Sequence, residues 1–189
     1  MQKCKICILS ILFFSNSIVF TQENRLSKHN IWFVSLDLGA QMSGIKSEDF
    51  ISSNYSPMVR FLGGKWFNSR IGVQIGYQGR YFNAIADNDK HFYDFYFIEG
   101  VINAKNIISS SKKDKKFHEL LFHAGAGLFQ NNYYGSSNFH GILGATNNFT
   151  ILKNIKIKFD IGAIVGWDIY QGDDDILPNI SLGVIYSLN

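Results

Sequence analysis

A regular alternation of apolar and polar residues limits the fold of this chain more than any other feature of its sequence. Segment 71–82 is the clearest case, with one face made of Ile71, Val73, Ile75, Tyr77 and Tyr81 and the other of Gly72, Gln74, Gly76, Gln78, Arg80 and Phe82. Successive side chains of a β-strand point to opposite faces, whereas a helix repeats about every 3.6 residues. The alternation therefore predicts strands that each separate two chemically different environments.

Seven more segments bring the number of predicted strands to eight. The clear ones are 34–41, 155–169 and 180–188, and the less regular ones are 57–66, 92–104, 117–129 and 139–149. Strands of about ten residues cross a bilayer when tilted, and eight is the smallest usual number in a closed membrane barrel. In these seven, the predicted apolar face holds Val34, Leu36, Leu38, Ala40, Val59, Phe61, Phe95, Phe97, Phe122, Ala124, Ala126, Leu128, Leu143, Ala145, Ile155, Ile157, Phe159, Ile161, Val165, Trp167, Ile169, Ile180, Leu182, Val184, Tyr186 and Leu188.

The direction of the apolar face decides between a membrane barrel and a soluble one. Three features favour an all-β, eight-stranded, antiparallel up-and-down transmembrane barrel with its apolar face outward. The polar faces are rich in glycine, which suits a narrow lumen, and aromatic residues gather near the strand ends, where membrane interfaces would lie. The last strand also runs to the chain end without the closing helix of a lipocalin. A secreted, lipocalin-like ligand-binding barrel is the alternative interpretation.

Residues 1–21 have the pattern of a secretory signal peptide, which leaves 22–189 as one barrel domain. Lys3 and Lys5 open it, and its apolar stretch is shorter than the roughly 20 residues of a transmembrane helix. Both cysteines, Cys4 and Cys7, lie in this segment, so their spacing predicts neither a redox motif nor a zinc site. Removing the two lysines lowers the net charge from +3 to +1, which argues against nucleic acid as a partner.

The predicted connections differ in length and charge, and this difference indicates an orientation. With a periplasmic N-terminus, the outer loops are 43–56, 83–91, 130–138 and 170–178, and the periplasmic turns are 67–70, 105–116 and 150–154. Outer-membrane barrels have short periplasmic turns, so 105–116 is longer than expected. The outer loops carry mainly acids (Glu48, Asp49, Asp87, Asp89, Asp173, Asp174 and Asp175), and the inner turns and their margins carry mainly bases (Lys65, Arg70, Lys105, Lys112, Lys113, Lys115, Lys116, Lys153 and Lys156).

Several stretches carry a resemblance to a known family. They are Ser56-Pro57, Gly63-Gly64-Lys65-Trp66-Phe67, Gly76-Tyr77-Gln78-Gly79, His123-Ala124-Gly125-Ala126-Gly127 and the terminal Leu182–Leu188. With the leader and the eight strands, they resemble the outer-membrane protein β-barrel domain family, the OmpA-like and OmpX-like porin-fold barrels of the Gram-negative cell envelope. The resemblance implies a location in the cell outer membrane, contact with outer-membrane lipid and lipopolysaccharide, and insertion by the barrel-assembly machinery. The chain departs from the family by ending in Leu188-Asn189, where an aromatic residue is usual.

The polar faces are expected to bring charged residues together in the lumen. Those predicted to point inward are Asp37, Arg60, Arg80, His123, Asp160 and Asp168, with Lys158 near the periplasmic end. An eight-stranded lumen is just wide enough for side chains to fill, and unpaired buried charges are costly. We therefore expect a plugged barrel with internal salt bridges. A proton relay or a narrow ion path is the alternative.

No residues have the spacing of a catalytic, cofactor-binding or metal site. Asp173-Asp174-Asp175 lacks the spacing and final Glu of an EF-hand, and the histidines show no metal-binding spacing. His123 and His140 lie on neighbouring predicted strands, where a hydrogen-bonded pair is expected rather than a zinc site. The sequence thus predicts a non-enzymatic outer-membrane protein with a role in envelope integrity, adhesion or loop-mediated binding. The alternative is a lipid-modifying barrel enzyme that uses His91 or His140 near the outer rim.

Overall fold

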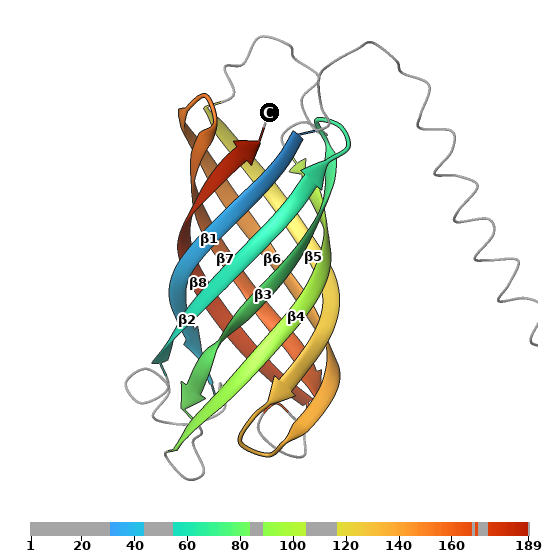
Figure 1. Cartoon of the computed structure of the whole chain (residues 1–189), viewed down its shortest axis with the longest axis vertical. Coiled ribbons are helices and arrows are strands. Elements are labelled where there is room, and N and C mark those ends of the chain that lie inside the picture. Colours follow the sequence, from blue (N-terminus) through green and yellow to red (C-terminus); the bar gives the residue numbers. More distant parts are fainter. Residues whose placement is uncertain are drawn as a thin grey trace, which may run out of the picture.

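The computed structural model of the chain is a closed, eight-stranded antiparallel barrel (Figure 1). It describes residues 31–43, 55–83, 89–104, 117–167, 169 and 174–188. The strands are β1 (Ile31–Met42), β2 (Tyr55–Trp66), β3 (Ile71–Asn83), β4 (Lys90–Asn103), β5 (His118–Asn131), β6 (Ser136–Leu152), β7 (Ile155–Trp167) and β8 (Asp174–Leu188). Each strand pairs with the next, and β1 closes the barrel on β8. The predicted number of strands and their up-and-down order are confirmed.

Among the described residues, no helix is long and apolar enough to span a membrane.

Most strands extend further than the alternation predicts, whereas β7 ends two residues before the end of its predicted segment, at Trp167. They are 12 to 17 residues long, and β6 continues past both ends of its predicted segment 139–149. The predicted outer loop 130–138 is therefore only the turn 132–135, and Asp174 and Asp175 belong to β8 rather than to the loop 170–178. The polar residues at these strand ends continue the ladder because antiparallel partners supply their backbone hydrogen bonds. The predicted leader 1–21 and segment 105–116 lie outside the described residues.

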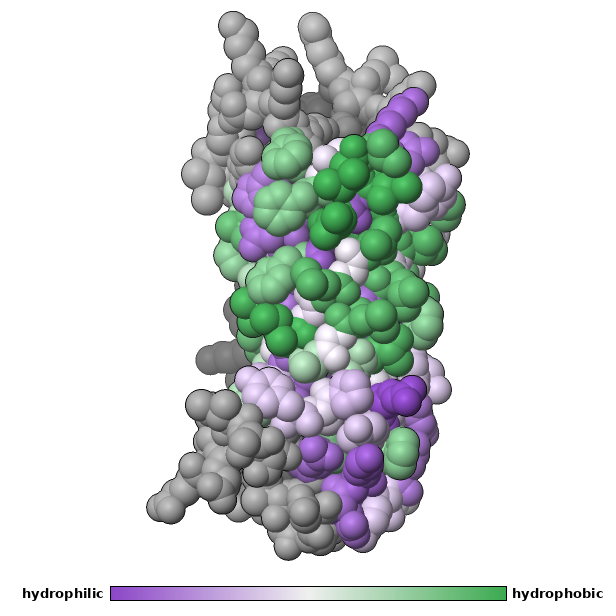
Figure 2. Space-filling view, turned by 90° about the vertical axis from the view of Figure 1, so that its left-hand side faces the viewer, coloured by the Kyte–Doolittle hydropathy of each residue, from purple (hydrophilic) through white to green (hydrophobic). Residues whose placement is uncertain are grey.

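The apolar face of the barrel points outward, as predicted. Leu38, Ile75 and Leu182 are 61–63% exposed, whereas Asp37 and Asp160 are completely buried. Figure 2 shows apolar side chains gathered in a broad band above a hydrophilic end of the barrel. This is the end that holds the β5–β6 turn in Figure 1, and we call it the loop end. Soluble monomers rarely expose continuous apolar patches of more than a few hundred Å². A closed barrel also pairs its strand edges, which hydrocarbon requires. The structure is therefore that of a transmembrane barrel, the reverse of the lipocalin-like arrangement.

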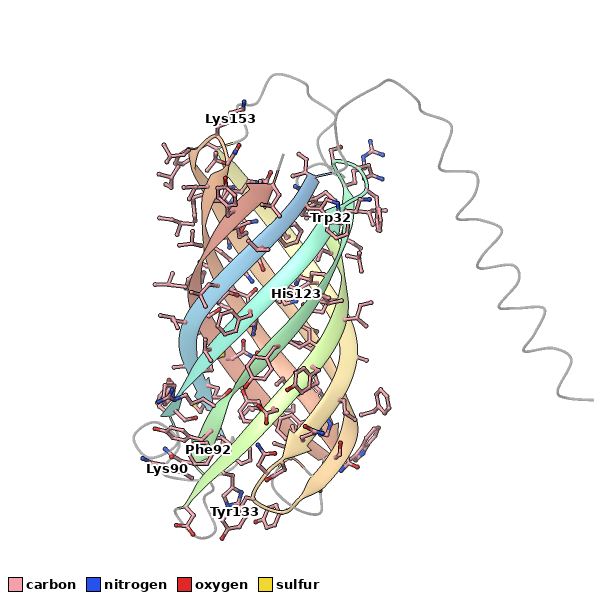
Figure 3. The ribbon with its side chains drawn as sticks, viewed as in Figure 1. Trp32, Lys90, Phe92, His123, Tyr133 and Lys153 are labelled. Atoms are coloured by element: carbon pink, nitrogen blue, oxygen red, sulfur yellow. The ribbon has the colours of Figure 1, made fainter. Side chains whose placement is uncertain are left out.

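Exposed aromatic side chains flank the apolar band at both ends. Trp32 lies near the end that holds the start of β1, and Phe92 lies near the loop end (Figure 3). A lysine accompanies an aromatic ring at each end, with Lys65 Nζ 5.0 Å from the Trp32 ring centroid and Lys90 Nζ 5.0 Å from that of Tyr81. Amphipathic rings and snorkelling lysines suit the interface between hydrocarbon and water.

The prediction was wrong about the inner face of β4 and about Ile169. Phe95 and Phe97 point into the lumen and are 0% and 5% exposed, whereas Tyr96 and Ile98 face outward. Strand β4 is apolar on both faces, so alternation alone could not tell lumen from lipid. Ile169, which follows β7, is also fully buried rather than on the outer face.

Candidate functional site: the barrel lumen

The middle of the lumen is organised around the guanidinium of Arg60 on β2. Its Nη1 donates to Asp160 Oδ1 at 2.6 Å, its Nη2 to Asn179 Oδ1 at 2.6 Å, and its Nε to Gln78 Oε1 at 2.9 Å. The acceptors come from β7, β8 and β3, so this one side chain connects four strands across the tube. Arg60 is only 1% exposed. A buried guanidinium requires this set of acceptors, because unpaired burial of its charge would be very costly.

His123 on β5 bridges two carboxylates on opposite sides of its ring. Its Nδ1 lies 2.6 Å from Glu99 Oε1, and its Nε2 lies 3.0 Å from Asp160 Oδ2. Carboxylates only accept hydrogen bonds, so both ring nitrogens donate when both acids are ionised, and the imidazole then carries a positive charge. Glu99 also accepts a hydrogen bond from Gln74 Nε2 at 2.6 Å. His123 is buried, and its label lies about midway along the barrel in Figure 3.

Lys158 on β7 completes the charged layer. Its Nζ lies 2.7 Å from Asp37 Oδ2, and Asp37 accepts a second hydrogen bond from Ser35 Oγ at 2.6 Å. Thr146 Oγ1 donates to Asp160 Oδ2 at 2.5 Å. We call this set the charge layer: Asp37, Arg60, Glu99, His123, Lys158 and Asp160. Its three acids balance Arg60, Lys158 and the imidazolium, which confirms the predicted internal salt bridges.

Two glycines, Gly144 on β6 and Gly183 on β8, make room for the charge layer. A Cβ atom on Gly144 would lie 2.5 Å from Nε2 of His123, and one on Gly183 would overlap the carboxylate of Asp37. Any larger residue would displace these buried side chains from their partners. The glycine-rich polar faces seen in the sequence therefore reflect the crowding of a narrow lumen.

The half of the lumen towards the loops is packed with apolar and aromatic side chains. Tyr93 and Phe129 stack with ring centroids 4.9 Å apart, and Phe95 and Phe97 stack at 5.1 Å. We call this set the aromatic cluster: Leu62, Phe82, Tyr93, Phe95, Phe97, Phe129, Ile142, Ile164, Ile169 and Leu177. All its members are buried, so the tube is blocked between the charge layer and the loop end.

A few polar groups join the aromatic cluster to the charge layer. Gln78, which accepts from Arg60, donates through Nε2 to Tyr93 Oη at 3.1 Å. Tyr93 Oη donates in turn to Gln41 Oε1 at 2.5 Å. The phenol of Tyr93 is therefore satisfied although its ring belongs to the apolar half, as buried tyrosines usually are.

Histidines and tyrosines cover the loop end of the aromatic cluster. His91 stacks on Tyr133 of the β5–β6 turn, with ring centroids 3.9 Å apart and nearly parallel planes. His140 packs against Phe129 at 4.9 Å, and its Nδ1 lies 3.1 Å from the backbone oxygen of Asn138. The predicted hydrogen-bonded pair of His123 and His140 is wrong. The ladder places His140 opposite Gly127 and not opposite His123, whose ring nitrogens face Glu99 and Asp160.

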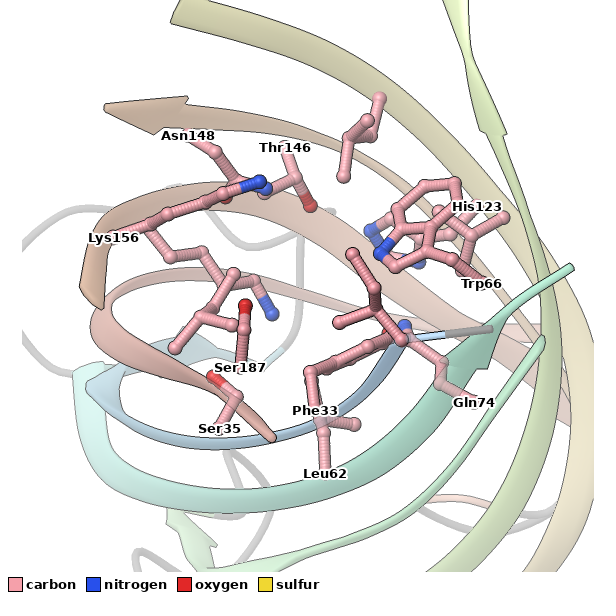
Figure 4. A pocket seen from close by; sticks show the side chains of 15 residues that line it. Phe33, Ser35, Leu62, Trp66, Gln74, His123, Thr146, Asn148, Lys156 and Ser187 are labelled. Atoms are coloured by element: carbon pink, nitrogen blue, oxygen red, sulfur yellow. The ribbon is translucent and has the colours of Figure 1, made fainter. Parts of the chain in front are cut away.

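A chamber of about 70 Å³ lies on the other side of the charge layer (Figure 4). Phe33 and Trp66 form an apolar wall together with Leu62, the member of the aromatic cluster that reaches the chamber, and Thr146, Asn148, Lys156, Lys158 and Ser187 form a polar wall. The buried Oδ1 of Asn148 accepts no hydrogen bond from the described residues. The volume suits about two water molecules, and the polar wall supplies partners for them. The chamber thus combines one polar wall with one apolar wall, whereas the aromatic cluster is lined almost entirely by apolar side chains.

Arg80 and Asp168 do not join the charge layer as the sequence predicted. Arg80 is exposed, and its backbone has a φ of +136°, which turns its side chain away from an inward register position. Asp168 lies outside the described residues. Glu99 is the member of the charge layer that the sequence analysis missed. Its signal was an acid within a largely apolar stretch of β4, between Ile98 and Gly100.

The charged side chains described in the lumen are directed at one another. Among the described residues, no group of three or more His, Cys, Asp or Glu residues could hold a metal ion. Both ring nitrogens of His123 face carboxylates, so this imidazole is not aimed at a nucleophile. What the arrangement does is fill the tube and fix the strands around it.

Comparison with known proteins identifies the fold. The structure of Neisserial surface protein A matches with a TM-score of 0.56 and 12% identity over 83% of this chain and 97% of that protein. The N-terminal β-barrel domain of Pseudomonas aeruginosa OprF and the attachment invasion locus protein Ail of Yersinia pestis are further matches, at TM-scores of 0.49 and 0.47. Their identities are 9% over 82% of this chain and 97% of OprF, and 15% over 85% of this chain and 99% of Ail. No family model and no curated protein sequence matches the chain. The chain therefore has the fold of the small outer-membrane barrels, as its sequence resemblance implies.

Proposed function

We propose that this chain is an integral protein of the cell outer membrane, exported by a cleaved signal peptide, that serves as a closed scaffold for surface contact. The observation that carries the proposal is the combination of an outward apolar band with a lumen filled by the aromatic cluster and the charge layer. The band places the barrel in lipid, and the filling argues against a transport role. The role that remains is structural support of the envelope or binding through the outer loops, as in adhesion.

The outer loops are the part of such a scaffold that can vary without cost to the barrel. We place a surface ligand at this end of the barrel, on the connections between β1 and β2, β3 and β4, β5 and β6, and β7 and β8. Exposed aromatic residues, Tyr133 and Tyr134, stand at the β5–β6 turn within this region. Outer-membrane lipid, lipopolysaccharide and the barrel-assembly machinery are the other partners that we propose, and nucleic acid is not among them.

We propose no catalysed reaction and no cofactor for this protein. A lipid-modifying barrel needs a histidine with a nucleophile where lipid can reach it. The two histidines near the loop end, His91 and His140, are buried inside the barrel at 0% and 2% exposure and pack against aromatic rings. No observation therefore favours the lipid-modifying alternative.

Cell fractionation followed by gel electrophoresis of unheated and heated samples tests the proposal. We expect the protein in the outer membrane, with a mobility that changes on heating because a closed barrel resists detergent unfolding. The purified protein should also leave a planar lipid bilayer non-conducting. Recovery in soluble form without detergent, or steady channels in the bilayer, would contradict the proposal.

A further inference from the structure

We propose that Arg80 and Lys90, on the outer surface of β3 and β4, bind the phosphate of an outer-leaflet lipid headgroup. The proposal rests on the proposed function, because it requires the barrel to lie in the outer membrane. It assigns a defined binding site to the wall of the barrel rather than to its loops or lumen.

The backbone at Arg80 turns a cation out of the lumen. The ladder pairs Arg80 with Met58 and Tyr93, which point inward and are 3% and 1% exposed. A regular strand would therefore direct Arg80 into the aromatic cluster, where a charge has no partner. Its φ of +136° is a conformation that residues with side chains rarely adopt, and the side chain is exposed instead.

Lys90 lies on the same outer surface, on the neighbouring strand. Its Nζ lies 5.0 Å from the Tyr81 ring centroid, and Tyr81 packs against Phe92 with centroids 5.6 Å apart. The ladder pairs Tyr81 with Phe92, and Asn83 with Lys90. Lys90 and Phe92 are seen together near the loop end in Figure 3. Arg80 directly precedes Tyr81 on β3, and the ladder places Lys90 on the neighbouring strand three residues further along, so the two exposed cations lie near the same outer end of β3 and β4. We call this region the patch.

The patch lies at the depth where headgroups are expected. Outward-facing apolar residues of β3 begin at Ile71, continue through Ile75 and end with Tyr81. Ten residues at about 3.4 Å each, tilted by about 40°, rise about 26 Å, which matches the apolar band of an outer-membrane barrel. Arg80 therefore stands at the outer edge of the band, next to the phosphates of the lipid leaflet.

The chemistry of the patch favours a phosphate. A guanidinium can contact two phosphate oxygens at once, and an ammonium adds a mobile point charge. Asp94 shares this outer surface, but its Oδ1 accepts from Tyr77 Oη at 2.7 Å and its Oδ2 from Asn132 Nδ2 at 2.8 Å. Within the described parts of the chain, no carboxylate forms an ion pair with Arg80. The guanidinium is thus available to an anionic ligand.

Native mass spectrometry of the protein released from lipid nanodiscs tests the site. The nanodiscs contain phosphatidylcholine with a minor fraction of lipid A, which carries phosphate. We expect the double variant R80Q/K90Q to retain about tenfold less lipid A than the wild type, because two basic contacts are lost. The matched control R70Q/K153Q makes the same charge change at the opposite end of the barrel, and we expect less than a twofold loss. R80K keeps the charge without the two-pronged contact and should retain an intermediate amount.

Three results would overturn the site: no loss in R80Q/K90Q, an equal loss in R70Q/K153Q, or undiminished retention of dephosphorylated lipid A by the wild type. Free inorganic phosphate should not displace lipid A if the site belongs to a membrane headgroup, and displacement would reassign it to soluble phosphate. The heat-dependent gel mobility of each variant reports whether the barrel has formed. Normal mobility without selective lipid loss contradicts the site alone, whereas failure of the wild type to enter nanodiscs contradicts the proposed function.

Discussion

The two halves of the lumen fill the same narrow tube with opposite chemistry. On one side, the charge layer holds the strands through ion pairs such as Arg60–Asp160 at 2.6 Å, and it borders a small chamber with one polar wall and one apolar wall. On the other, the aromatic cluster holds them through stacked rings such as Tyr93 and Phe129. The charged half depends on every partner being present, because each removal leaves a buried charge. The stability of the apolar half depends instead on how completely its side chains fill the lumen. This contrast predicts how each half should respond to substitution.

Asp160→Asn should produce the largest effect. The carboxylate of Asp160 faces Arg60, His123 and Lys158, so its neutralisation leaves buried cations without balance. We expect the free energy of unfolding in lipid vesicles to fall by about 4 kcal/mol, within the range for broken buried ion pairs. Glu119→Gln, an acid whose ion pair with Lys156 is partly exposed, is the control and should change stability by at most about 0.5 kcal/mol. Equal effects of the two changes would refute the role of the charge layer.

Phe129→Ala should destabilise the apolar half by about 3 kcal/mol, because it opens a cavity where Tyr93, Phe95 and His140 now pack. The measurement is again denaturant unfolding in vesicles. Phe139→Ala makes the same change on the outer surface, where Phe139 is 76% exposed, and should cost less than half as much. A larger effect at Phe139 would mean that the lipid contact, and not the lumen packing, stabilises this end.

Tyr93→Phe tests the hydrogen bonds that link the two halves, and we expect it to lower the free energy of unfolding by about 1 kcal/mol. The ring stays in the aromatic cluster, but Gln41 and Gln78 lose their shared hydrogen-bond partner. Tyr96→Phe on the same strand faces outward and serves as the control, for which we expect almost no change. If Tyr93→Phe is also neutral, the two halves are energetically independent.

Lys156→Gln should have the smallest effect, at most about 0.5 kcal/mol. Its Nζ lies 2.6 Å from Glu119 Oε2 at the mouth of the chamber, but both side chains are partly exposed. Solvent screens such pairs, so their net contribution is small. A double-mutant cycle with Glu119→Gln measures the pair directly. A coupling energy as large as that of Arg60 and Asp160 would show that the mouth is as dry as the charge layer.

Much of this architecture follows from the sequence, because one face of most strands is polar. In β1, β7 and β8, residues such as Asp37, Lys158 and Ser181 mark the lumen face without ambiguity. Together with the less regular segments, whose number and length fit a membrane barrel, these faces predict a closed barrel with salt bridges inside it. The pairing of His123 with Glu99 and Asp160 was not predictable in this way, since it depends on register across three strands.

The apolar half shows where the alternation loses its information. Strand β4 carries aromatic residues on both faces, so nothing in its pattern distinguishes Phe95 in the lumen from Tyr96 in the lipid. The prediction that Arg80 points into the lumen is wrong for a different reason. It occupies an inward register position, but its unusual backbone angle reverses the direction of the side chain. Neither periodicity nor composition reports such a local reversal.

The pairing of β1 with β8 constrains the order in which the strands of the barrel can assemble. Trp32 pairs with Leu188 and Gln41 with Asn179, so the two edges that meet are almost the whole described chain apart. Contacts so distant in sequence are slow to form, because a long loop must close before they contribute any stability. Until that moment both edges carry unpaired backbone groups that invite association with other chains. The open edges of the sheet must therefore be protected from other chains until the barrel closes. Pairing of β8 with β1 is the step that satisfies these backbone groups.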